Sequence, residues 1–203
     1  MMAEETAVRA NLAEASRFLD FMAEGEEVTF QTFDDTKGKS TLARIIHGTL
    51  DHAARQLVKL NDSGAGIYWM VNYGNGKGRS TENVTGVRCL FLDLDGSPLK
   101  PVLAAGIEPH AVVESSPGKW HVYWCVSGCT TERFKPLQRA LAAKFAGDPS
   151  VHDLPRVLRV PGFIHRKGEP FETRIHSLQP FQPYDVDELV ARLELDVIDE
   201  PPA

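Results

Sequence analysis

The segment from Val87 to Leu94 constrains the fold most, because it is almost continuously apolar. Such runs are typical of strands buried on both faces, so we expect 87–94 to be a buried central strand of a sheet. Asp93 lies near the end of this run, and Asp95-Gly96 follow it directly. Side chains two residues apart on a strand point to the same face, so the two carboxylates are predicted to project together.

The rest of the chain mixes helical and strand patterns. Helical spacing of apolar residues, with capping residues, predicts helices over 8–23, 49–60, 130–145 and 185–193. Alternating or short apolar runs predict strands over 28–33, 66–71, 111–114, 119–126 and 171–177. Residues 148–167 read as irregular or partly helical. This order favours an α+β (mixed α/β) fold over a regular βαβ array.

Composition narrows the class of protein. The chain has 203 residues, which suits one domain, and a net charge of −6. It contains no apolar run long enough to span a membrane, and its acidic start does not resemble a signal peptide, so we expect a cytoplasmic protein without membrane contact. The charge is uneven, because 156–167 is basic and contains no acid. The three cysteines lack the paired Cys/His spacing of a zinc finger, so we expect no structural zinc.

The carboxylate pair is compatible with two chemistries. Asp93 and Asp95 could hold Mg²⁺ or Mn²⁺, which prefer oxygen ligands. Alternatively, Asp93 could be the nucleophile of a haloacid-dehalogenase-like phosphohydrolase, with Gly147-Asp148 as a later acidic motif. The short interval between Asp95 and Gly147, part of it a predicted hairpin, argues against that phosphatase. The long segment before Asp93 argues the same way.

Basic residues are predicted near the pair. Lys119 and His121 share one face of the strand after the turn at Pro117-Gly118, and both could bind phosphate. Arg156 and Arg159 would share a face if this segment were a helical turn. More donors follow at His165 and Lys167, and a Gly-rich loop over 72–80 carries Lys77 and Arg79.

Together these motifs resemble the archaeo-eukaryotic primase superfamily, in particular the RepB-like primase–polymerases of plasmids and phages. The resemblance rests on Asp93-Leu94-Asp95, on Lys119-Trp120-His121 as the small-x-His element, and on Asp148 followed by Arg156 and Arg159. It extends from about 28 to 176, including 30–35 and the loop over 72–79.

The resemblance implies roles for these residues. Asp93, Asp95 and Asp148 would hold two Mg²⁺ or Mn²⁺ ions, with Asp153 as the alternative third acid. The residues expected to bind the incoming nucleotide are Lys119, His121, Arg156, Arg159, His165 and Lys167, and His121 would be part of the catalytic centre. Lys77 and Arg79 would contact template or nucleotide.

The resemblance also implies partners and organisation. Expected partners are a single-stranded DNA template, deoxy- or ribonucleoside triphosphates, and a replicative helicase or a C-terminal accessory domain, in a bacterial or phage-infected cell. One catalytic domain over 1–198 would comprise an N-terminal αβ module (1–84), an RRM-like catalytic module (85–180) with an antiparallel or mixed sheet flanked by helices, and a closing helix (181–198). Residues 199–203 would be a tail or linker. A non-catalytic module that binds single-stranded nucleic acid is the third functional hypothesis.

Overall fold

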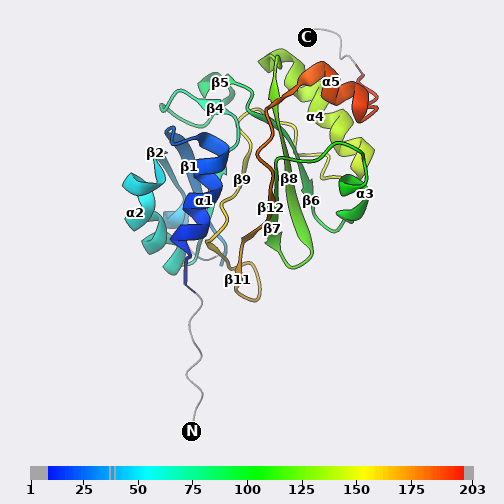
Figure 1. Ribbon diagram of the computed structural model, residues 1–203. Coiled ribbons are helices and arrows are strands. Elements are labelled where there is room, and N and C mark those ends of the chain that lie inside the picture. The colour runs from blue at the N-terminus through cyan, green and yellow to red at the C-terminus, as the bar shows by residue number, and fades with distance from the viewer. Residues whose placement is uncertain (1–8, 37, 39, 199–203) are drawn as a thin grey trace.

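The computed structural model describes residues 9–36, 38 and 40–198, and it shows two main β-sheets with helices packed against them (Figure 1), together with two small two-stranded sheets. The helices are α1 (Leu12–Ala23), α2 (Leu50–Asp62), α3 (Lys100–Leu103), α4 (Thr131–Phe145) and α5 (Val186–Arg192), with short 3-10 turns at Ser40–Leu42 and Thr81–Asn83. The longer strands are β1 (Val28–Asp34), β2 (Arg44–Gly48), β3 (Ala65–Met70), β6 (Cys89–Leu94), β7 (Ala111–Ser116), β8 (Lys119–Ser127) and β12 (Arg174–Leu178). The shorter strands are β4 (Tyr73–Gly74), β5 (Val84–Gly86), β9 (Val157–Arg159), β10 (Ile164–His165), β11 (Phe171–Glu172) and β13 (Tyr184–Asp185). The two small sheets are β4-β5 and β10-β11.

The first sheet has the strand order β2-β1-β3-β9 and is antiparallel throughout. Its fourth strand comes from far along the chain, since Tyr68 in β3 lies opposite Arg159 in β9. The predicted boundary between an N-terminal module (1–84) and a catalytic module (85–180) stays a prediction. The pairing of β3 with β9 shows, however, that the chain after residue 85 supplies a strand to the N-terminal sheet. Both α1 and α2 pack near this sheet (Figure 1).

The second sheet is built around β8. Strands β7 and β12 continue the sheet on one side, and β6 pairs antiparallel on the other, with Asp93 opposite His121. Strand β13 joins the far end of β8 in parallel. The mixed α+β class predicted from the sequence is therefore confirmed, and the predicted hairpin over 111–126 is present.

Strand β6 is buried as predicted, but the predicted central position is wrong. Within the described residues it pairs only with β8, so it is an edge strand. Its outer edge is covered by Gln138 of α4, which accepts a hydrogen bond from the Phe91 N–H at 3.0 Å and donates one to the Phe91 carbonyl at 2.7 Å. A helix side chain thus satisfies backbone groups that a neighbouring strand would otherwise pair.

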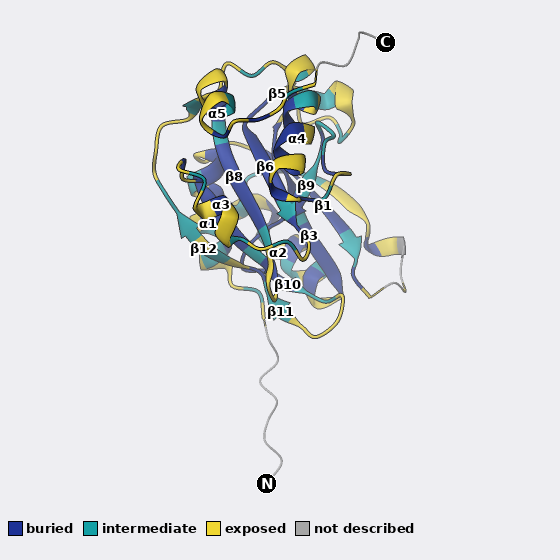
Figure 2. Ribbon diagram, turned by 90° about the vertical axis from the view of Figure 1, so that its right-hand side faces the viewer, coloured by how far each residue is buried: buried dark blue, intermediate teal, exposed yellow. Residues whose placement is uncertain are grey.

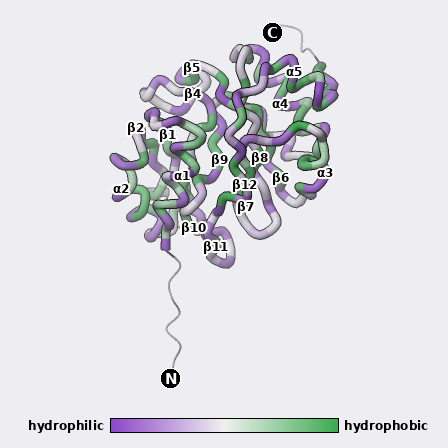
Figure 3. Tube along the Cα trace, viewed as in Figure 1, coloured by the Kyte–Doolittle hydropathy of each residue, from purple (hydrophilic) through white to green (hydrophobic). Residues whose placement is uncertain are grey.

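An aromatic cluster joins the two sheets. Phe18 of α1 lies 5.5 Å from the Trp69 ring of β3 and 5.8 Å from the Tyr123 ring of β8, measured between ring centroids. All three side chains are fully buried. The central strands are buried in Figure 2 and mainly hydrophobic in Figure 3, so one apolar core supports both sheets.

Other predicted elements differ in detail. The first helix begins at Leu12, and Asn11 is its N-cap. We expected this helix to start at Val8, which lies outside the described residues. The expected cap of the last helix is confirmed, since Asp185 accepts from the N–H groups of Asp187 and Glu188. The segment 148–167 is largely irregular, one of the two predicted outcomes, and it contains the short strands β9 and β10 but no helix. The predicted tail over 199–203 lies outside the described residues, and none of the described helices could cross a membrane.

Candidate active site

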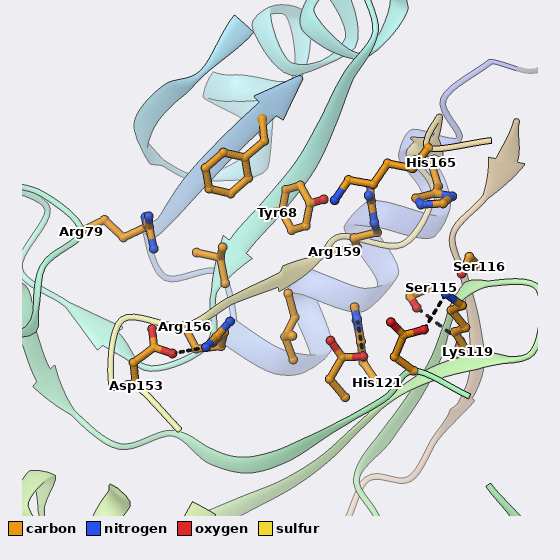
Figure 4. Close-up of a pocket in the computed structure, with 16 residues that line it drawn as sticks. Tyr68, Arg79, Ser115, Ser116, Lys119, His121, Asp153, Arg156, Arg159 and His165 are labelled. Atoms are coloured by element: carbon orange, nitrogen blue, oxygen red, sulfur yellow. Dashed lines mark hydrogen bonds and ion pairs between the residues drawn. The ribbon is translucent and has the colours of Figure 1, made fainter. Parts of the chain in front are cut away.

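A cleft of about 440 Å³ lies between the two sheets (Figure 4). Strands β6 and β8 and the end of β7 form one wall, and β3, β9 and the segments around β9 form the other. The lining residues are Phe33, Tyr68, Arg79, Asp93, Asp95, Ser115, Ser116, Lys119, His121, Asp153, Arg156, Val157, Leu158, Arg159, His165 and Lys167. The structure therefore brings nearly all residues singled out from the sequence into one place.

The two carboxylates lie at the end of β6 and face the cleft together, as the strand pattern predicts. The Asp93 side chain is 26% exposed, whereas that of Asp95 is 61% exposed. Burial raises the pKa of Asp93 to about 6, and the negative charges of Asp148 and Asp95 add to the effect. Asp93 is thus a carboxylate whose ionised form is disfavoured by its surroundings.

Asp148 lies beside Asp93, although it does not line the cleft. Its backbone N–H donates to the Asp93 carbonyl at 2.9 Å. Gly147 allows this approach, because a Cβ at that position would lie 3.0 Å from the Leu92 side chain and 3.5 Å from the Asp93 carbonyl oxygen. The alternative third acid, Asp153, lines the cleft but forms an ion pair with Arg156.

Lys119 and His121 share the cleft-facing side of β8, as the alternation predicts. The Lys119 ammonium lies 2.5 Å from Asp95 Oδ1. His121 Nε2 lies 3.9 Å from Asp93 Oδ1, and its Nδ1 is buried without a hydrogen-bond partner. Burial, followed by the nearby positive charge of Arg159, lowers the pKa of His121 to about 3, so its imidazole is neutral near pH 7.

Arg159 reaches the cleft in a way that the sequence did not indicate. Its Nη1 and Nη2 donate to Asp35 at 2.8 and 3.0 Å, and its guanidinium lies 4.6 Å from the Tyr68 ring centroid. Burial alone would raise the pKa of Asp35, but the bonds from Arg159 and the Arg166 N–H lower it. Gly66 leaves the space for this pair, since a Cβ there would lie 2.6 Å from Arg159 Nη1.

The other basic residues are placed unequally. Arg156 directly precedes β9 and donates a hydrogen bond to the Ser150 carbonyl. The helical turn that we expected to align Arg156 with Arg159 is wrong, because the chain is extended from Val157 to Arg159. Burial and the charge of Arg159 lower the pKa of His165 to about 4. Arg79 lines the cleft and donates to Gln31 at 2.8 Å. Lys77 is not among the lining residues.

Several lining residues were not predicted as part of the site. Ser115 and Ser116 reach the cleft because the β7–β8 register shifts between Glu114 and Ser116. Phe33 and Tyr68 present aromatic rings from the first sheet, with centroids 5.3 Å apart. The Pro117-Gly118 turn located the hairpin, but no local pattern could indicate which side chains of the first sheet lie opposite it.

The acidic residues have the chemistry of a divalent-cation site. Among the described residues, no group of three or more His, Cys, Asp or Glu side chains is arranged to hold a metal. Nevertheless, Asp93, Asp95 and Asp148 offer only oxygen donors, which suit Mg²⁺ and Mn²⁺. Burial, followed by the charges of Asp148 and Asp95, raises the pKa of Asp93, and a bound cation would offset this cost of ionisation.

Comparisons with known proteins agree with this geometry. The chain matches the RepB DNA-primase N-terminal domain over residues 79–198. It resembles the AEP domain of the cyanophage S-2L primase-polymerase, with a TM-score of 0.73, 19% identity, and coverage of 91% of this chain and 98% of that one. It also resembles the catalytic domain of primase RepB′ in complex with initiator DNA, with a TM-score of 0.67, 20% identity, and coverage of 90% and 91%. A search of curated proteins gave no match.

The family match covers more than half of the chain, and the structural neighbours share its fold over nearly the whole length. The RRM-like sheet with an added N-terminal αβ part is therefore the fold expected for this superfamily. The chain belongs to the family of the RepB DNA-primase N-terminal domain, and it shares its fold with the AEP domain of the cyanophage primase-polymerase and with primase RepB′.

Proposed function

We propose that this chain is a template-dependent nucleotidyltransferase that makes or extends primers on single-stranded DNA. The observation that carries the proposal is the cleft itself, where Asp93 and Asp95 face a wall of cationic side chains. The cleft lining contains five Lys or Arg residues, namely Arg79, Lys119, Arg156, Arg159 and Lys167. Its local charge therefore differs from the net charge of −6 and suits a triphosphate.

In this proposal Asp93, Asp95 and Asp148 hold two Mg²⁺ or Mn²⁺ ions. Asp148 is preferred to Asp153, because its charge acts on Asp93 whereas Asp153 is paired with Arg156. Bound metals would activate the attacking 3′-hydroxyl and stabilise the charge on the departing pyrophosphate. His165 and Lys167 line the same cleft and complete the set of proposed phosphate contacts.

Lys119 would change partner during nucleotide binding. In the structure it is held by Asp95, so it becomes available for phosphate once Asp95 has another partner. His121 is neutral near pH 7 and would donate a hydrogen bond to phosphate through one ring N–H. Arg159 uses two of its five N–H donors on Asp35, which leaves the others to bind phosphate in a fixed position.

The DNA partner is supported by the neighbour RepB′, whose catalytic domain is described in complex with initiator DNA. Phe33 and Tyr68 could stack on a base, and Arg79 lies next to Phe33 with its guanidinium carbon 5.8 Å from the ring centroid. We propose that this aromatic side of the cleft faces the template or the nucleobase, and that a helicase or accessory domain acts with the chain in the cytoplasm of the host cell.

The test is synthesis on single-stranded DNA with nucleoside triphosphates and Mg²⁺ or Mn²⁺. We expect labelled product from the wild-type chain and none from Asp93→Ala combined with Asp95→Ala. Arg139→Ala is a matched control, because Arg139 lies on α4 outside the cleft lining. Product from the double variant, or no product from folded wild-type protein, would refute the proposal.

The two other hypotheses are less well supported. A haloacid-dehalogenase-like phosphohydrolase is not favoured, because β6 pairs antiparallel with β8 and the fold matches primases. Hydrolysis of a generic phosphate ester with trapping of an aspartyl-phosphate at Asp93 would reverse this judgement. Tight binding of single-stranded DNA without any metal-dependent synthesis would instead identify a binding module.

A further inference from the structure

Cys89 and Cys125 form a thiol pair that the proposed reaction does not use. They lie directly opposite each other on β6 and β8, and their Sγ atoms are 3.2 Å apart. Both thiols are free, and Cys89 is completely buried. The pair belongs to the same strand ladder as Asp93 and His121, but it lies at the opposite end.

The backbone pairing at these positions is compatible with a disulfide. The Val126 N–H donates to the Arg88 carbonyl at 3.0 Å, so Arg88 and Val126 are a hydrogen-bonded pair. The next pair along, Cys89 and Cys125, is therefore a non-hydrogen-bonded pair, in which Cα atoms approach to about 4.5 Å. Consistent with this, the Cys125 N–H points away from β6 and donates to His110. A Cα separation of about 4.5 Å falls within the range that disulfides span, about 4.4 to 6.8 Å.

Cys125 is the thiol that a reagent in solution can reach. It lines a surface cavity of about 380 Å³ together with Arg88, His110 and Tyr73, at the end of β8 opposite to Lys119 and His121. Its hydrogen bond with Cys89, and to a smaller extent the positive charge of Arg88, lower the pKa of the Cys125 thiol despite burial. Burial raises the pKa of Cys89. One thiol is thus reactive and accessible, and its partner is protected.

We propose that Cys89 and Cys125 are a modification site, at which hydrogen peroxide oxidises the two thiols to a disulfide between β6 and β8. The Cys125 thiolate attacks the peroxide, so that an S–O bond forms and the O–O bond breaks; the departing hydroxide takes up the proton that Cys125 released and leaves as water. The Cys89 sulfur then attacks Cys125 Sγ, so that the S–S bond forms, the S–O bond breaks and a second water carries away the Cys89 proton. The two thiols are oxidised and the peroxide is reduced.

The crosslink would close a loop whose ends are 36 positions apart. This loop contains β7 and the turn that leads into β8. Because β6 is an edge strand that pairs only with β8 among the described strands, the disulfide would fasten the strand that carries Asp93.

The third cysteine is a control built into the chain. Cys129 lies just after β8, and its Sγ contacts the Thr130 carbonyl at 3.6 Å and no other thiol. Burial raises the pKa of Cys129 to about 11. Cys129 is therefore expected to stay reduced under mild peroxide.

The test is hydrogen peroxide treatment of the reduced, folded protein, followed by denaturation, alkylation and intact mass measurement. Untreated protein should take up three alkyl groups, and treated protein only one, with the mass lowered by two hydrogen atoms before labelling. Peptide mapping should identify a Cys89–Cys125 disulfide, and dithiothreitol should restore three labels. The same peroxide dose applied in urea should give much less crosslink, because the fold no longer holds the sulfurs together.

Two variants make the result decisive. Cys129→Ser should fall from two labels to none, whereas Cys125→Ser should keep two labels after treatment. Oxygen added to Cys125 while Cys89 remains labelled would overturn the proposal. Unchanged labelling of the treated wild-type chain, or a disulfide that involves Cys129, would overturn it equally.

Discussion

Replacing Asp93 by Asn should stabilise the metal-free protein while abolishing synthesis. Asp93 has a pKa near 6 in the fold and 3.8 in the unfolded reference state, so the folded state binds the proton more tightly. The contribution of Asp93 to stability is therefore greatest below about pH 4 and falls as the pH rises towards 6. Above pH 6 the ionised Asp93 lowers the unfolding free energy of the wild-type protein by the full amount, whereas Asn at this position has no charge and does not lower it.

The size of the effect follows from the pKa shift. A shift of about two units corresponds to at most about 3 kcal/mol, at roughly 1.4 kcal/mol per unit. Because the side chain is 26% exposed, water reduces this value, and we expect a gain of about 1 to 3 kcal/mol at pH 7. Asn loses no hydrogen bond that the structure shows for the carboxylate, and it has nearly the same shape.

The assay is urea unfolding of both proteins in a chelating buffer at pH 4, 5, 6, 7 and 8. The difference in unfolding free energy should grow between pH 4 and 6 and then stay constant, which isolates Asp93 from groups that titrate in both proteins. Asp95→Asn is the control, since its exposed ion pair with Lys119 should change stability by less than about 1 kcal/mol. A destabilised Asp93→Asn protein, or a gain independent of pH, would refute the reasoning.

Other substitutions test the packing around the cleft. Asp35→Asn should lower the unfolding free energy by about 3 to 5 kcal/mol, because Arg159 would be left buried with an unbalanced charge; a urea titration that shows less than about 1 kcal/mol would contradict this. Gly66→Ala should cost about 1 to 3 kcal/mol in the same assay, since its Cβ would collide with that pair, and an unchanged midpoint would contradict it. Gln138→Leu should cost about 1 to 3 kcal/mol for each backbone group of β6 left unpaired, with faster amide hydrogen exchange in β6; unchanged exchange would argue against the edge-strand account. Lys119→Met should raise the KM for nucleotide about tenfold, equivalent to about 1.4 kcal/mol of binding, with a smaller effect on kcat; an unchanged KM would exclude a phosphate contact.

Local patterns were sufficient for most of the fold. The apolar run before Asp93 located β6, the Pro117-Gly118 turn located the β7–β8 hairpin, and alternation placed Lys119 and His121 on one face. The position of β6 in the sheet could not be obtained in this way. An edge strand covered by a helix side chain such as Gln138 has the same apolar composition as a central strand.

The site was only partly predictable for a similar reason. Carboxylates and basic residues stand out as residue types, so the main members of the cleft were identified. Their partners were not, since Asp35 lies 124 positions from Arg159 and carries no local signal for that pairing. The segment 148–167 is largely irregular, one of the two predicted outcomes, but its strand β9 was not predicted, because it is stabilised by pairing with the distant β3 and not by its own pattern.

The most direct test of the central claim is whether the template dictates the product. On single-stranded oligo(dT) with Mn²⁺ and all four nucleotides, the wild-type chain should incorporate adenine nucleotides, and on oligo(dC) it should incorporate guanine nucleotides. Asp93→Asn should incorporate none on either template, even though it is expected to be the more stable protein. Incorporation that ignores the template base, or that survives in Asp93→Asn, would contradict template-directed synthesis in the cleft between the two sheets.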